Sequence, residues 1–146
     1  MRVIAGSLIL AALSSSALAS DADKAYEFRQ GYWQVVKHEF GDVMAAMIQK
    51  KRPMDQERFQ AAAARLAVLA PLAKETTPVG SESDDSRALP KIWSDADGYA
   101  EKLAAFEQNV AALNQAVASG DQSAIAPAFK DVAGACKACH KAYRAD

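Results

Sequence analysis

Five residues near the C-terminus, Cys136-Lys137-Ala138-Cys139-His140, constrain this chain more than any other stretch. Two cysteines three residues apart lie on one face of a helix, where both thiols can bond to the two vinyl groups on one side of a porphyrin. The histidine follows one turn after the first cysteine, on the same face, and a neutral imidazole is a common ligand of haem iron. The C-x-x-C-H pattern therefore predicts covalent haem c, attached through Cys136 and Cys139, with His140 as the axial iron ligand.

Three other uses of this cysteine pair fit the rest of the chain less well. A thioredoxin-type redox pair opens a helix in an α/β fold, whereas this pair stands near the end of the last predicted helix. A zinc site needs a fourth ligand, and the only other histidine is His38. A structural disulfide would suit an oxidising compartment, but it leaves His140 without a role.

Residues 1–19 have the three parts of a secretory signal peptide. They contain a basic start at Arg2, an apolar run over 3–13 and an A-x-A cleavage site that ends at Ala19. The apolar run is too short for a good transmembrane helix, and no other stretch is expected to cross a membrane. We therefore expect export to the periplasm, cleavage after Ala19 or one residue later, and one mature domain over 20–146.

Charge and composition narrow the class of protein further. The formal net charge is -1, and removal of Arg2 with the signal peptide makes it -2. Haem propionates would add more negative charge, which argues against nucleic acids and anionic membrane surfaces as partners. Alanine is abundant and runs of β-branched residues are rare, and this composition favours helices over strands.

Four segments show the apolar spacing of amphipathic helices. We expect them over 21–51, from Asp55 to about Pro71, from Asp95 to Gly120, and from Asp121 to the C-terminus. The aspartates suit helix N-termini, Gly120 suits a helix C-cap, and an irregular segment over 75–94 separates the second helix from the third. The sequence thus predicts an all-α, antiparallel up-down-up-down four-helix bundle with haem c in its core. Cys136 and His140 are expected on the buried stripe of the last helix.

The chain resembles the cytochromes c′, the class II c-type cytochromes, over essentially all of its mature length. A C-x-x-C-H near the C-terminus is itself discriminating, because class I c-type cytochromes carry it near the mature N-terminus. The other matching stretches are Phe28-Arg29-Gln30, Gly80-Ser81-Glu82, Ile92-Trp93-Ser94-Asp95, Phe129-Lys130-Asp131-Val132 and Lys141-Ala142-Tyr143-Arg144.

The resemblance implies a role for each matching residue. Arg29 and Gln30 match a pair that contacts the haem and its propionates, and Glu82 matches an acidic residue of the loop around the haem. The residues of the C-x-x-C-H stretch match the thioether cysteines and the axial ligand. Arg144 matches a basic residue beside the imidazole, where it affects ligand access from the proximal side.

Trp33 stands one helical turn after Arg29, where cytochromes c′ hold a side chain over the distal face of the haem. Low-spin relatives have a ligating methionine there, but an indole nitrogen has no lone pair free for iron. We therefore predict five-coordinate, largely high-spin iron, with NO and CO binding if the ring moves aside. Plain core packing of Trp33 is compatible with the same position. His38 is expected on another face of the helix, in solvent.

Two functions follow from the resemblance. The first is a periplasmic protein that binds NO or CO, and the second is an electron carrier that cycles between Fe(III) and Fe(II) with a periplasmic redox partner. The open iron favours the first, because a change of coordination number raises the reorganisation energy of electron transfer. No distal His/Arg pair for cleaving an O–O bond is visible in the pattern, so we predict no enzyme.

The resemblance also implies a homodimer formed through the first two helices. Candidate apolar contacts on those helices are Val36, Met44, Ile48 and Val68.

Overall fold

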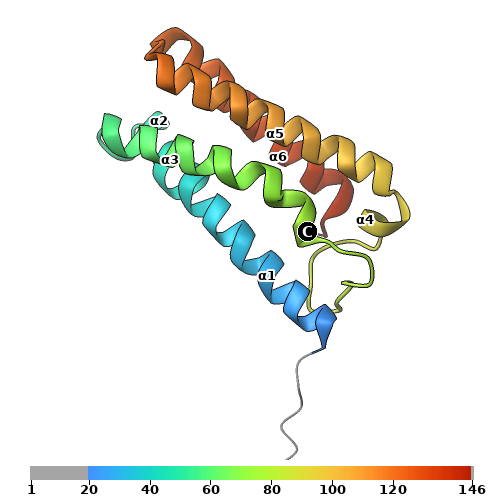
Figure 1. Cartoon of the computed structure of the whole chain (residues 1–146). Coiled ribbons are helices and arrows are strands. Elements are labelled where there is room, and N and C mark those ends of the chain that lie inside the picture. Colours follow the sequence, from blue (N-terminus) through green and yellow to red (C-terminus); the bar gives the residue numbers. More distant parts are fainter. Residues whose placement is uncertain (1–19, 146) are drawn as a thin grey trace, which may run out of the picture.

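The computed structural model describes residues 20–145, and the predicted signal peptide lies outside this part of the chain. Over 20–145 the chain is helical except for its connecting loops and one isolated antiparallel bridge between Ala88 and Arg144. Successive long helices run in alternating directions, which is the all-α bundle that the sequence predicts (Figure 1). None of the helices within 20–145 has both the length and the apolar character that crossing a membrane requires.

The predicted first helix forms, but its winding changes halfway. Ser20 caps α1 (Asp21–Val36) through a reciprocal pair of hydrogen bonds with Asp23. The chain continues through a π-helical segment, η1 (Lys37–Ala45), into one last turn, α2 (Ala46–Ile48). In a π-helix each amide bonds to the carbonyl five residues back, so residues five apart come onto nearly the same side.

The second helix, α3 (Gln56–Leu69), begins where the sequence predicts. Asp55 caps it by accepting the amide of Arg58 at 3.0 Å. Near Pro71 the chain tightens into a 3₁₀ segment, η2 (Ala70–Thr76), because proline has no amide to continue the α-helical pattern.

The third and fourth helices, α5 (Ala96–Ser119) and α6 (Gln122–Tyr143), form a hairpin. Gly120 has a left-handed backbone with φ of 71°, as a C-capping glycine should, and Asp121 accepts two amides from the first turn of α6. Both predicted boundaries are confirmed. A short helix, α4 (Lys91–Ser94), lies within the segment that was predicted to be irregular.

Helices α5 and α6 lie side by side, and α3 packs against both α5 and η1 (Figure 1). Phe40 of η1 and Phe129 of α6 stack with their ring centroids 4.4 Å apart. Fully burying each large apolar side chain stabilises the fold by about 1.5–3 kcal/mol. The largest fully buried apolar side chains are Phe59, Met44, Leu66, Leu113, Val43, Val110, Val117 and Val132. From this core α1 slants away toward its N-terminus (Figure 1).

Burial along the first helix corrects part of the predicted dimer surface. Val36 and Met44 are core residues, so assigning them to an exposed face was wrong. The π-helical turn brings Met44 to the same side as buried Glu39, whose carboxylate accepts two hydrogen bonds of 2.7 and 2.8 Å from Arg65 of α3. Val68 is 72% exposed, in agreement with the prediction.

Candidate haem-binding site

The two cysteines of α6 lie on one face of the helix, as their spacing predicts. Cys136 and Cys139 are half-buried free thiols. Burial, and then the charge of Cys139, raise the pKa of Cys136 to about 11, and burial also raises the pKa of Cys139. Both side chains are therefore neutral thiols at neutral pH, on the partly covered face of the last helix.

His140 follows on the same helix but is exposed, so the prediction that it lies on the buried stripe was wrong. The stripe is buried at Val132 and again at Tyr143, and the helices around it leave the part between them open. Partial desolvation lowers the pKa of His140, and the charges of Arg144 and Arg87 lower it further. The imidazole is therefore neutral at neutral pH, which is the form that binds iron.

Arg29 is 4% exposed and joins α1 to the loop after η2. Its terminal nitrogen atoms donate to the carbonyl of Thr76 at 3.2 Å, and to the carbonyl and hydroxyl of Ser81 at 3.2 and 3.3 Å. The guanidinium carbon lies 5.9 Å from the ring centroids of both Tyr26 and Trp93. The side chain is thus enclosed by the loop and two aromatic rings.

The enclosure of the Arg29 guanidinium affects both its pKa and its hydrogen bonding. Burial lowers the pKa of Arg29, although Tyr99, Tyr26 and Glu82 act in the opposite direction. The Nε atom of Arg29 is buried and has no hydrogen-bond partner among residues 20–145. A buried donor on a charged group is costly without an acceptor, and a carboxylate such as a haem propionate is a fitting one. Two free thiols, a neutral imidazole and this orphaned donor together fit a c-type haem.

Gln30, Glu82 and Arg144 are all exposed. Glu82 lies near enough to Arg29 for its charge to act on the guanidinium. Arg144 caps α6, and its amide donates to the carbonyl of His140 at 3.1 Å. The predicted residues therefore form two groups, one around Arg29 and one around His140, and the structure does not join Gln30 to either through a hydrogen bond of the described side chains.

Trp33 is half-buried and points into the bundle. Its ring meets that of Tyr32 edge to face at 4.8 Å and lies tilted on Phe106 of α5 at 6.0 Å. This is the core packing that was predicted to be compatible with a distal position, and the distal role itself stays a prediction. His38, in contrast, is exposed as predicted.

Tyr99 lies near both groups, and no role at the site was predicted for it. It is buried on α5, and burial is the main cause that raises its pKa. The hydroxyls of Thr77 and Thr76 and the charge of Arg29 act to lower this pKa, whereas the charge of Cys139 raises it. The only signal in the sequence was its place on the apolar stripe of α5, which cannot show what lies opposite.

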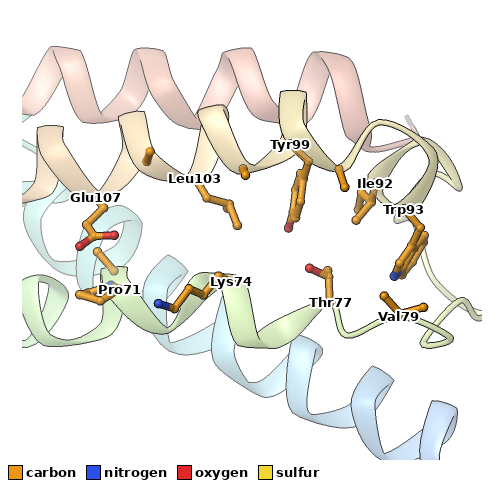
Figure 2. A pocket seen from close by; sticks show the side chains of 13 residues that line it. Pro71, Lys74, Thr77, Val79, Ile92, Trp93, Tyr99, Leu103 and Glu107 are labelled. Atoms are coloured by element: carbon orange, nitrogen blue, oxygen red, sulfur yellow. The ribbon is translucent and has the colours of Figure 1, made fainter.

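A cavity of about 330 Å³ lies between η2 and α5 (Figure 2). Tyr99 and Leu103 extend from α5 toward Lys74 and Thr77 in this view, and Trp93 lies at one end. None of the eight residues that the sequence assigned to the haem site lines the cavity. Two cavity residues also contact the site: Trp93, whose ring lies against the Arg29 guanidinium, and Tyr99, whose ring meets that of Tyr143 on α6.

The fold and this donor set define a helical-bundle c-type haem protein. The family model described as Cytochrome C' matches residues 24–144. Cytochrome c′ from Cereibacter sphaeroides is 37% identical over 99% of this chain and 98% of its own length. Cytochrome c-554 from the same organism is 35% identical over 94% and 93%.

Solved structures agree with the sequence relatives. Cytochrome c prime from Shewanella frigidimarina has a TM-score of 0.82 and 36% identity, covering 88% of this chain and 100% of that one. A nitric oxide complex of a cytochrome c prime variant from Alcaligenes xylosoxidans has a TM-score of 0.79 and 32% identity, covering 88% and 99%. This chain belongs to the cytochrome c′ family, whose members bind c-type haem.

Proposed function

We propose that this protein is a periplasmic gas-binding cytochrome c′ and not an enzyme. One haem c is attached through Cys136 and Cys139, and His140 is the only protein ligand of a five-coordinate iron. The haem supplies an iron atom that binds NO or CO on the distal side. The nitric oxide complex of the related Alcaligenes protein supports this ligand class.

The observation that carries the proposal is the packing of Trp33. Its ring packs against Tyr32 and against Phe106 of α5, on the side of α1 that faces the bundle, so a haem held there would meet an indole ring from α1. Tryptophan offers no lone pair to a metal. His38 is 57% exposed, with its Nδ1 3.9 Å from the Asp42 carboxylate, and fully buried Met44 belongs to the core around η1. Within 20–145, these positions supply no competing sixth ligand.

The remaining residues have supporting roles in this proposal. Neutral His140 offers its ring nitrogen to the iron, while Arg144 stands beside the imidazole and limits approach from that side. Arg29 holds the loop with its terminal nitrogens and keeps Nε for a propionate. Gln30 and Glu82 border the same end of the haem from the solvent side.

Absorption spectra of the purified holoprotein test the proposal. Ferric and ferrous spectra, recorded with and without NO and CO, should be broad and high-spin and should shift when gas is added. Sharp low-spin bands that ignore both gases would contradict it. They would favour the alternative, an electron carrier with a hidden sixth ligand. A redox partner could then approach the exposed residues in the last turn of α6.

The role of Trp33 has its own test. Replacing Trp33 by Ala removes the ring that covers the distal side, so CO should bind the ferrous protein faster. Phe28→Ala is a matched control, because Phe28 is a half-exposed aromatic residue of the same helix. Stopped-flow CO binding should show a faster rate for the first variant alone. Equal rates in wild type and Trp33→Ala would count against a distal role.

The same proposal includes a homodimer formed through α1 and α3. Phe28 and Val35 of α1, and Val68 and Leu72 of α3, are apolar and exposed. A second copy of the chain would cover them. Val68→Glu would bury a charge in this interface, so sedimentation should show dimers for wild type and monomers for the variant. Wild-type monomers at high concentration would exclude this assembly.

A further inference from the structure

The last residue of α6, Tyr143, is 4% exposed although His140 lies only three residues before it. Its hydroxyl donates to Asp95 Oδ2 at 2.8 Å, and its ring meets Tyr99 edge to face at 5.2 Å. Lys91 Nζ lies 5.2 Å from the centroid of the ring. Partial desolvation and the Asp95 bond raise the pKa of Tyr143 to about 12, so the hydroxyl remains a donor at neutral pH.

The backbone around Tyr143 is fastened as well. Its carbonyl accepts the amide of Leu89 at 3.0 Å, and the amide of Ala145 donates to the carbonyl of Arg87 at 2.8 Å. The Arg87 guanidinium returns two hydrogen bonds to the carbonyl of Ala145. Helix ends normally fray because their last carbonyls lack partners within the helix. Here the segment before α4 satisfies one of them and anchors the residue beyond the helix.

Gly98, in the first turn of α5, leaves the space in which Tyr143 and Asp95 meet. A Cβ atom at Gly98 would lie 2.7 Å from the Tyr143 hydroxyl and 2.7 and 2.9 Å from the two Asp95 carboxylate oxygens. Its φ is not in the positive region, so space rather than backbone conformation requires the glycine. Glycine within a helix costs about 1 kcal/mol relative to alanine. The close approach of the two side chains offsets this cost.

We propose that Tyr143, held by Asp95 in the space left by Gly98, is a positioning residue for His140. It touches no reacting atom and acts through the last turn of α6, whose rigidity carries its fixed position back to the imidazole. This inference rests on the proposed function, because His140 is an iron ligand only there. This clamp, formed by Tyr143, Asp95 and Gly98, sets the position of the His140 imidazole, although the imidazole itself is exposed.

Tyr143→Phe in the holoprotein tests the clamp, because it removes one hydroxyl and keeps the ring. Losing a hydrogen bond to a charged group costs about 1.5 kcal/mol, which corresponds to about tenfold faster hydrogen exchange at amides in the last turn of α6. The iron–histidine stretching band of the ferrous protein, measured by resonance Raman spectroscopy, should shift or broaden. A conservative variant, Asp95→Asn, keeps an acceptor for the hydroxyl and should retain the wild-type band.

Tyr32→Phe is the matched control. It also removes a hydrogen bond donated by a tyrosine hydroxyl, 3.0 Å to the carbonyl of Leu69. This bond joins α1 to α3 and does not involve α6. It should lower stability somewhat less, because this acceptor is neutral, and leave the band unchanged. Faster exchange with an unchanged band in Tyr143→Phe would overturn the proposal, as would the same band shift in Tyr32→Phe.

Failure of the proposed function would look different. A wild-type holoprotein that is six-coordinate would lack a five-coordinate iron–histidine band altogether. The haem reduction potential, which depends on the axial ligand, then takes the place of the band. A potential that moves in Tyr143→Phe and not in Tyr32→Phe supports the clamp, and a potential that moves in neither variant overturns it.

Discussion

Replacing Arg29 by Met tests whether this arginine organises the loop beside the site. Methionine keeps an unbranched apolar stem but removes all donors, which leaves the carbonyls of Thr76 and Ser81 and the Ser81 hydroxyl without their charged partner. Hydrogen bonds to charged groups contribute about 1.5–3 kcal/mol each. At 3.2–3.3 Å these three are long, so we take about 1 kcal/mol each and expect the free energy of unfolding to fall by about 3 kcal/mol.

Urea unfolding of the holoprotein, followed by circular dichroism, measures this loss. Hydrogen exchange at the Ser81 amide, which donates to the carbonyl of Pro78 at 3.2 Å, reports on the loop itself and should become faster. Arg58→Met is the control, because Arg58 is exposed on α3 and surface changes of this kind stay within about 0.5 kcal/mol. A loss below about 1 kcal/mol in Arg29→Met, or an equal loss in the control, would refute the reasoning.

Two further predictions concern pH and haem attachment. The Arg65 hydrogen bonds lower the pKa of Glu39, so the stability from this pair is present above the unfolded pKa, about 4.3, and is lost as pH falls through the lower folded value. Because Arg65 is half-exposed, solvent screens the pair and limits its contribution to stability to about 1 kcal/mol. Urea unfolding should show that Glu39→Gln is less stable than wild type at pH 7 and equally stable near pH 2. Replacing both Cys136 and Cys139 by Ala should let haem separate from the unfolded chain, read as loss of haem absorbance after denaturing gel filtration, and retention of haem would contradict thioether attachment.

The ends of the last three long helices could be predicted because their causes are local. Asp55 and Asp121 accept amides two or three residues ahead, and Gly120 adopts the left-handed backbone that glycine allows. The C-x-x-C-H stretch is equally local, since the helix alone puts its side chains on one face. These features need nothing from the rest of the fold, so the sequence suffices for them.

The π-helical segment could not be predicted, because its cause is tertiary. An α-helical period over 21–51 places Val36, Glu39 and Val43 on one face, but it does not place Met44 there. The wider turn brings Glu39 and Met44, five residues apart, to the interior together. Arg65 of the neighbouring helix makes the buried carboxylate tolerable, and its position depends on how α3 packs.

The same distinction between local and tertiary causes explains why the sequence did not predict the exposure of His140. The apolar spacing of α6 continues from Phe129 and Val132 through Cys136 and His140 to Tyr143, and a helical period alone treats these positions alike. In the fold, Val132 packs into the core and Tyr143 is held by Asp95, while Cys136, Cys139 and His140 between them are only partly covered or exposed. A stripe anchored at both ends and open in its middle is what a helix needs if a planar group is to lie against it. The residues with haem chemistry stand in that open interval, so an unbroken apolar period can include the part of a helix that the rest of the protein does not cover.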